Sequence, residues 1–142
     1  MNNIRIVVNK IPISASRPRV SRFSAYYNEP YRSYKEEIKE FMTKYMSNEE
    51  KLMYPKHEPL HIDIIFYMPI PKMSKKKTLD TIGKFHVKKP DKDNLEKAVL
   101  DSMNSVVYHD DGQVCSSTVK KIYSDKPRTE INIYSLEEGC CE

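Results

Sequence analysis

The sequence has little of what marks membrane-spanning, disordered or disulfide-built proteins. It contains 3 glycines, 3 cysteines and no tryptophan, and its mean hydropathy is -0.69. No apolar run approaches the length of about 18 residues that indicates a membrane-spanning helix, and the first residues lack the basic head and apolar core of a signal peptide. With 39% hydrophobic and 31% charged residues, the composition is typical of a soluble globular protein, which we expect to be cytoplasmic.

We expect neither a disulfide framework from the cysteines nor a metal site from the histidines. An odd number of cysteines leaves at least one unpaired, and no Cys-x-x-Cys spacing points to zinc. The histidines are scattered along the sequence, and we expect no metal site from them. We expect all of them to be packing or surface residues: Cys115, Cys140, Cys141, His57, His61, His86 and His109.

Acidic residues are missing from the first part of the chain, and basic residues take their place. Residues 1–28 hold no aspartate or glutamate, although the net charge of the whole chain is only +4. A second basic stretch, residues 72–92, meets only Asp80 before Asp91. Such stretches suit the phosphates of a nucleic acid, although one basic run alone is more often a solvated face. The candidate DNA-binding residues are Arg17, Arg19, Arg22, Lys75, Lys76, Lys77 and Lys89.

Hydrophobic patterning predicts one α/β domain, residues 1–142, in which a small mixed β-sheet packs against helices. Strands are expected at residues 4–11 and 60–70, and residues 117–125 and 129–137 are expected to form a terminal hairpin. Helical spacing of apolar residues predicts helices at residues 31–46 and from about residue 94, where Asp93 and Glu96 are expected to form a capping box. Residues 14–30 and 71–88 are expected to be loops.

Two acidic pairs, Asp91/Asp93 and Asp110/Asp111, stand in one charged stretch, residues 88–114. Side chains alternate along an extended backbone, so Asp91 and Asp93 point to the same side if residues 88–93 are extended. The second pair follows the predicted helix and a short connection, so it can fold back beside the first. Gathered carboxylates repel unless a cation neutralises them, and hard oxygen ligands of this kind favour Mg²⁺ or Mn²⁺.

Each part of this pattern also has a plain structural interpretation. An Asp-x-Asp pair alone occurs in caps and turns, and HDDGQV by itself is typical of a turn. Lys97 lies one helical turn from Asp93, where it can reach the neighbourhood of the predicted metal site. It also lies one turn from Asp101, which is therefore expected to orient the lysine through a salt bridge rather than to bind metal.

The stretch PDKDNLEKAVLDSMNSVVYHDDGQV resembles the signature of the RusA family of Holliday junction resolvases. The shared pattern is Asp-x-Asp-Asn-Leu, a lysine four residues after the second aspartate, an aspartate four residues beyond that, and Asp-Asp-x-Gln-Val. The upstream SRPRVSRFSAYYNEPYRSYKEEI is similar to the family's basic Arg-Pro-Arg segment and first helix. The resemblance covers roughly residues 15–125, and it departs from glycine-containing members in the connection NSVVYHDD, around Ser105 and Val106.

The resemblance implies roles for individual residues. It implies that Asp91, Asp93 and Asp111 are the essential, metal-binding carboxylates, that Lys97 is the catalytic lysine, and that Asp110 is the less critical member of its pair. It also implies a homodimer that cuts four-way DNA junctions with Mg²⁺. Such an enzyme makes paired nicks from two sites related by a dyad and leaves 5′-phosphate and 3′-hydroxyl ends.

Two other functions are compatible with the same residues. A metal-dependent nuclease can act on flaps or other branched DNA. A non-catalytic protein can bind branched DNA and use the acidic cluster only to close a salt-bridge network. Aromatic side chains beside the arginines can stack on unpaired bases, although core packing is the more common role of each: Phe23, Tyr26 and Tyr27.

Overall fold

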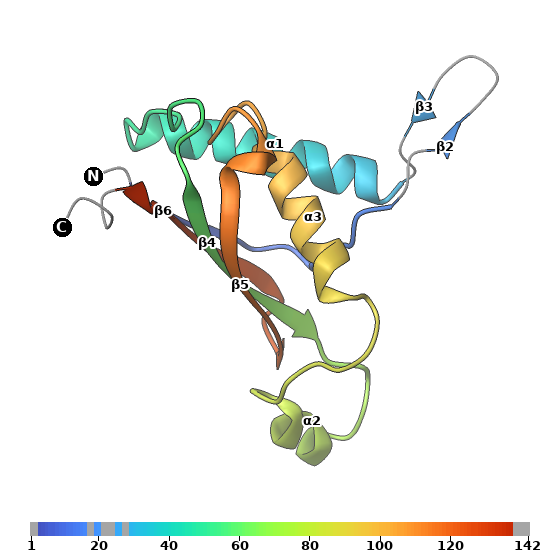
Figure 1. Ribbon diagram of the computed structural model, residues 1–142. Coiled ribbons are helices and arrows are strands. Elements are labelled where there is room, and N and C mark those ends of the chain that lie inside the picture. The colour runs from blue at the N-terminus through green and yellow to red at the C-terminus, as the bar shows by residue number, and fades with distance from the viewer. Residues whose placement is uncertain (1–2, 17–18, 21–24, 27–28, 138–142) are drawn as a thin grey trace.

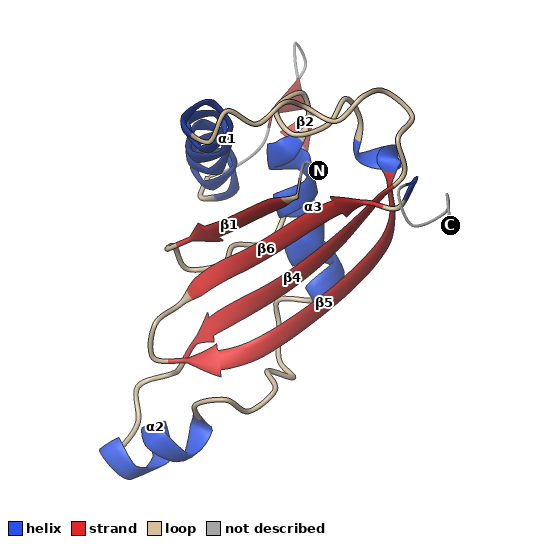
Figure 2. Cartoon of the chain, turned by 90° about the vertical axis from the view of Figure 1, so that its left-hand side faces the viewer, coloured by secondary structure: helices blue, strands red, loops and turns tan. Residues whose placement is uncertain are grey.

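Four strands form one mixed sheet, whose face is seen in Figure 2. The computed structural model describes residues 3–16, 19–20, 25–26 and 29–137, and of residues 19–20 and 25–26 it describes the backbone alone. The strand order is β1-β6-β4-β5. Strands β4 and β5 are parallel, whereas β6 is antiparallel to both β1 and β4. The strands are β1 (Ile4–Val8), β4 (Leu60–Pro69), β5 (Val114–Ser124) and β6 (Arg128–Ser135).

One face of the sheet is apolar and is buried by two helices. Strands β1 and β4 alternate between buried and more exposed residues, the pattern of strands with one face on the core. Helices α1 (Tyr31–Asn48) and α3 (Lys92–Met103) pack on the buried face. Figure 2 shows α3 behind the sheet, and no helix of the described chain covers the face toward the viewer. The sheet contributes Ile4, Ile6, Val8, Leu60, Ile62, Ile64, Phe66, Met68, Ile131 and Ile133 to the core.

Both helices bury the side chains that helical spacing brings to one side. Helix α1 confirms the prediction for residues 31–46, and the core also receives the apolar face of α3. The hydroxyl of Tyr31 donates a hydrogen bond of 3.0 Å to the Asp101 carboxylate and so links the two helices. The buried helical residues are Tyr31, Tyr34, Ile38, Met42, Met46, Leu95, Ala98, Val99, Ser102 and Met103. None of the described helices has the length and apolarity needed to cross a membrane.

The predicted terminal hairpin is wrong, because β4 lies between β5 and β6. Strand β4 pairs with β5 on one edge and with β6 on the other. A strand can bond at both edges because its backbone groups point alternately to the two sides. The short connection after Ser124 therefore passes the end of β4 and does not form a two-stranded turn.

Three other segments also differ from the sequence prediction: the start of α3, residues 71–88 and residues 14–30. Helix α3 begins at Lys92 with Asp91 as its N-cap, so Asp93 lies in the first turn and forms no capping box with Glu96. Residues 71–88, expected to be a loop, contain α2 (Lys75–Thr81), whose N-cap Ser74 accepts a hydrogen bond from the Lys77 amide at 3.3 Å. Residues 14–30 contain the short antiparallel pair β2 (Arg19–Val20) and β3 (Ala25–Tyr26).

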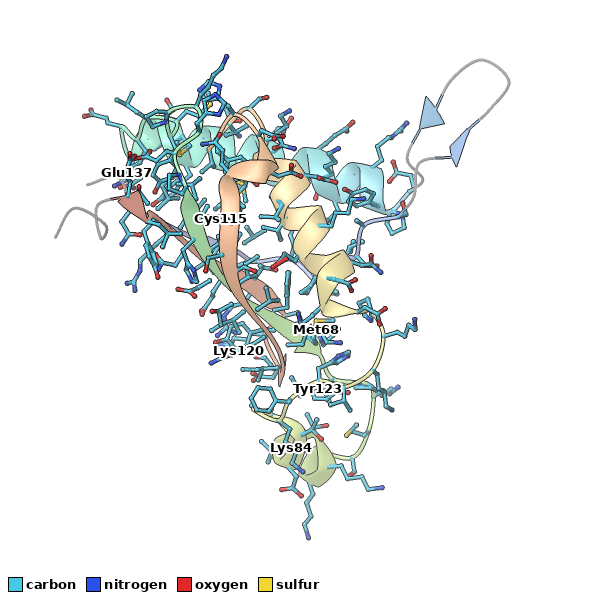
Figure 3. All side chains as sticks on the ribbon, in the orientation of Figure 1. Met68, Lys84, Cys115, Lys120, Tyr123 and Glu137 are labelled. Atoms are coloured by element: carbon cyan, nitrogen blue, oxygen red, sulfur yellow. The ribbon has the colours of Figure 1, made fainter. Side chains whose placement is uncertain are left out.

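Helix α3 lies beside β5 and runs in the opposite direction (Figure 1). Its first turn is therefore at the α2 end of the sheet, where Lys84 and Tyr123 are found in Figure 3. Its last turn is beside the short helix η1 (Asp111–Gln113), which leads into β5 near Cys115. The first acidic pair therefore lies at the start of α3, and the second lies at the start of η1, beside the other end of α3.

Candidate active site

The first acidic pair lies at the start of α3, in a groove lined by lysines. Asp91 is the N-cap residue, Asp93 lies in the first turn, and both are exposed. The groove has a volume of about 720 Å³ and offers two carboxylates to a cation and several ammonium groups to a phosphate. Its lining residues are His86, Val87, Lys88, Lys89, Asp91, Lys92, Asp93 and Lys121.

Lys121 of β5 holds the segment that leads to Asp91. Its Nζ donates hydrogen bonds of 2.7 Å to the carbonyl oxygens of Lys88 and Pro90. Lys89 Nζ lies 3.7 Å from the Asp91 carboxylate, and such an exposed ion pair adds little stability. Lys121 therefore fixes the backbone just before α3, whereas the Lys89 side chain can turn toward a ligand.

His86 forms part of the same groove but adds little positive charge to it. Its ring packs against Tyr123, with 4.8 Å between the ring centroids. Burial, followed by the positive charges of Lys121 and Lys88, lowers the pKa of the His86 imidazole. The positive charge of the groove near neutral pH therefore comes from the lysines.

The second acidic pair lies at the other end of α3. Asp110 is the N-cap of η1, and Asp111 is its first residue. Burial raises the pKa of the Asp111 carboxyl, and the nearby carboxylates of Asp110 and Asp101 raise it further. Asp101 is held in place by the Tyr31 hydroxyl. Three carboxylates therefore lie close enough to repel one another.

The structure brings Asp110 and Asp111 to Asp101 rather than to the first pair. Asp93 and Asp101 are eight residues apart on α3, which corresponds to about 12 Å along the helix axis. The chain after α3 turns back on the last helical turn, where the Val107 amide donates a bond of 3.0 Å to the Met103 carbonyl. Within residues 3–16 and 29–137, no three His, Cys, Asp or Glu side chains are grouped to hold one metal ion.

The chemistry of these side chains nevertheless fits a hard divalent cation. Carboxylate oxygens are the ligands that Mg²⁺ and Mn²⁺ prefer. The pKa of Asp111 is raised by two neighbouring carboxylates, and no cationic side chain of the described residues lowers it. A bound cation would relieve that repulsion, and each acidic pair has an exposed member that a cation from solvent can approach.

Lys97 lies between the two acidic clusters. It is four residues from both Asp93 and Asp101, so the three side chains project from one side of α3. Lys97 is exposed and forms no ion pair with any residue that the structure describes. The alternative salt bridge to Asp101 is therefore not formed, and the ammonium group is available to a ligand.

The candidate DNA-binding residues divide between described and undescribed parts of the chain. Lys75, Lys76 and Lys77 form the first turn of α2 and are exposed, and Lys89 lines the groove. The remaining candidates lie outside the residues described, or, at Arg19 and Tyr26, have only their backbone described: Arg17, Arg19, Arg22, Phe23, Tyr26 and Tyr27.

Sequence reasoning missed three residues that shape the site. Asp101 was expected only to orient Lys97 through a salt bridge, but its carboxylate lies near that of Asp111 in the second acidic pair. Lys121 and Gln113 act through bonds to distant backbone carbonyls. Asp101 and Gln113 had a signal in the sequence, because both belong to the shared pattern, whereas Lys121 had none.

Removal of the repulsion at Asp111 is expected to stabilise the metal-free protein. Because its pKa is raised, the folded chain binds the Asp111 proton more tightly than the unfolded chain does. This favours folding at low pH, and the contribution is lost as the pH rises through the raised pKa. Asp111→Asn should therefore raise Tm at pH 7 in EDTA, on the order of 1–2 °C because the pair is partly solvated.

The measurement is a thermal unfolding series of wild type and Asp111→Asn between pH 3 and 7. The gain should shrink toward low pH, where Asp111 is protonated in both states. An unchanged or lower Tm at pH 7 would show that the three carboxylates do not repel in the folded chain.

The chain is similar to known proteins over most of its length. The family model described as Endodeoxyribonuclease RusA matches residues 10–134. A protein of Bacillus subtilis (strain 168) described as "Uncharacterized protein YqaN" is 31% identical over 147 residues, which cover 94% of this chain and 96% of the relative. The family match includes both acidic pairs, Lys97, residues 10–28 of the first basic stretch and all of the second.

Proposed function

Since the chain belongs to the RusA family of endodeoxyribonucleases, we propose that it resolves four-way DNA junctions in recombination and repair, acting in the cytoplasm. The observation that carries the proposal is the order of charges along α3. The helix begins with Asp91 and Asp93 in a lysine-lined groove and continues through Lys97. Near its end lies Asp101, beside Asp111. Carboxylates for a cation and ammonium groups for phosphates therefore follow one another along a single helix.

We assign Mg²⁺ or Mn²⁺ ions to the carboxylates of Asp91 and Asp93 at the start of α3 and to that of Asp111 beside its end. When bound, such an ion supplies hydroxide from water and polarises the phosphate. Lys97 stabilises the negative charge that develops on the phosphorus oxygens and on the leaving 3′ oxygen. The bond between phosphorus and the 3′ oxygen breaks, the 3′ oxygen takes up a proton from solvent to become the 3′-hydroxyl, and the attacking oxygen stays on the 5′-phosphate.

A homodimer gives the second active site that paired nicking requires. A four-way junction has two-fold symmetry, so two symmetrical cuts need two sites related by a dyad. An isologous dimer of this chain has that symmetry. The exposed lysines of α2 and of the groove would then contact junction arms on both sides of the dyad.

Two alternatives use the same surface. A nuclease for flaps or other branched DNA needs the same carboxylates and Lys97, but not a two-fold arrangement of sites. A non-catalytic branched-DNA-binding protein needs the lysines, but it has no use for an exposed lysine between two acidic clusters. The available ammonium of Lys97 favours a nuclease over the binding protein.

Examination of the cleavage products tests the proposal. A resolvase should convert an end-labelled, mobile-core junction into two nicked duplexes with symmetrical cuts, and DNA ligase should seal those nicks because they carry 5′-phosphate and 3′-hydroxyl ends. Single unpaired cuts would favour the flap nuclease. Binding without any cut in Mg²⁺ or Mn²⁺ would favour the non-catalytic protein.

The lysines of α2 are expected to contribute electrostatic binding energy. Replacing Lys75, Lys76 and Lys77 together by alanine should weaken junction binding and flatten its salt dependence. The slope of log K against log [salt] should fall by about 0.9 for each phosphate that the variant no longer neutralises. Replacing Arg17 and Arg19 should have the same effect.

Fluorescence anisotropy at a series of KCl concentrations measures this slope. The matched control replaces Lys39 and Lys44, two exposed lysines of α1, a helix at the opposite end of the molecule from α2, and should leave the slope unchanged. Equal slopes for the α2 variant and wild type would show that Lys75, Lys76 and Lys77 are ordinary solvated surface residues that contact no phosphate.

A further inference from the structure

The amide side chain of Gln113 uses all of its hydrogen-bonding groups. Its Oε1 accepts from the backbone amides of His109 and Asp110, at 2.9 and 3.2 Å. Its Nε2 donates to the carbonyl oxygens of Pro55 and Glu58, at 2.9 and 3.1 Å. A glutamine amide has two N–H donors and an oxygen with two lone pairs, so no capacity is left over for a ligand.

These four bonds join two segments that are far apart in the sequence. One is residues 109–111, which carry the second acidic pair, and the other is the turn at residues 55–58 that precedes β4. The backbone amide of Gln113 also donates a bond of 3.0 Å to the Asp110 carbonyl. The acidic segment is therefore bonded to Gln113 through both the main chain and the side chain.

A fixed acidic segment has a chemical consequence at Asp111. Its carboxylate stands near those of Asp110 and Asp101, and like charges push one another toward solvent. A free loop would yield to that force by swinging the carboxylates apart. Bonds from Gln113 to the His109 and Asp110 amides oppose this movement.

We propose that Gln113 is a positioning residue, which fixes the backbone of residues 109–111 so that the Asp111 carboxylate is held ready for a divalent cation. The proposal rests on the proposed function, in which Asp111 is an essential carboxylate. Gln113 touches neither the cation nor the DNA. It acts by tying the acidic segment to the turn at residues 55–58.

A purely structural role would have a different signature. If Gln113 only stabilised the start of β5, its loss would lower Tm and leave the active site as it was. If it positions Asp111, its loss lowers the cleavage rate with junction affinity kept, and more metal is needed for half-maximal binding. Small displacements of reacting groups cost up to about 10²-fold in rate.

The test uses two variants of the full-length chain and a matched control. Gln113→Met keeps the length of the side chain without its hydrogen bonds, and Gln113→Asn keeps the amide but is too short to reach both segments. The control is Ser135→Ala, which removes the 3.1 Å bond from the Ser135 hydroxyl to the Glu58 carboxylate. That bond anchors the same turn from the side away from the acidic segment.

Three readouts decide the proposal. Cleavage at saturating junction should fall about 10-fold or more in both Gln113 variants, with junction Kd changed less than about 2-fold. The Mn²⁺ concentration for half-saturation, measured by electron paramagnetic resonance without DNA, should rise. Amide hydrogen exchange at His109 and Asp110 should quicken, and Ser135→Ala should match wild type in all three.

Failure of this inference differs from failure of the proposed function. Gln113 variants with lower Tm but wild-type cleavage, Mn²⁺ binding and exchange would overturn the positioning role and leave the nuclease intact. If wild type cuts no junction, the proposed function fails, and Mn²⁺ binding and amide exchange still decide whether Gln113 holds the acidic segment. Unchanged exchange at His109 and Asp110 in both variants overturns the inference in either case.

Discussion

Replacing Asp91, Asp93 or Asp111 by asparagine is expected to abolish junction cleavage. Each carboxylate is assigned to a divalent cation, and an amide oxygen of the same shape carries no negative charge to hold it. The rate should fall by at least about 10³-fold, which exceeds the usual loss of one electrostatic stabiliser. Single-turnover cleavage of a labelled junction in Mg²⁺ and in Mn²⁺ measures this effect.

Junction binding should survive in the same three variants. Neutralising a carboxylate beside a phosphate removes repulsion, so affinity should stay the same or rise. Asp125→Asn is the matched control, because Asp125 is exposed in the connection between β5 and β6 and belongs neither to the groove lining nor to the carboxylates around Asp111. Undiminished cutting by any one of the three variants would remove that residue from the site.

Lys97→Ala is expected to lower the cleavage rate by about 10²-fold or more while junction affinity falls much less. The lysine is exposed on α3 between the acidic clusters and pairs with no carboxylate of the described chain. Its ammonium can therefore stabilise the negative charge that develops on the scissile phosphate. Loss of one such stabilising group lowers the rate by a factor of this size. Single-turnover rates and anisotropy Kd values separate the two effects.

Lys97→Arg should not restore full activity. The guanidinium is planar and longer, so it places its charge differently from a compact ammonium. The opposite pattern would be Lys97→Ala with a near wild-type rate and a lower Tm. The lysine would then serve α3 as a helix-surface charge, and its catalytic role should be withdrawn.

The main elements of the fold can be predicted from the sequence because their signals are local. Alternation in residues 60–69 and helical spacing in residues 31–48 are visible within one element. The pairing of β5 is different, because alternation identifies a strand without naming its neighbours. Strand β4 lies between β5 and β6 in the sheet, although it ends more than 40 residues before β5 begins. The short connection after Ser124 therefore suggests a hairpin that the sheet does not contain.

The site could be predicted in part for the same reason. Asp91 and Asp93 are two residues apart, and the structure places both in one groove. The position of Asp111 depends on how the chain turns after α3, and that turn is fixed by bonds to residues 55 and 58. Spacing on a helix shows that Asp101 can meet Lys97, but it does not reveal that Tyr31 and Asp111 interact with Asp101 instead.

The proposed function is tested most directly by substrate choice under controlled metal. Purified protein is incubated with a synthetic four-way junction, a flap and a linear duplex of matched sequence, with Mg²⁺ and with EDTA. A resolvase should cut the junction symmetrically in Mg²⁺, leave the linear duplex intact, cut the flap poorly, and be inactive in EDTA. Equal cutting of flap and junction, or junction cutting that persists in EDTA, would contradict a metal-dependent junction resolvase.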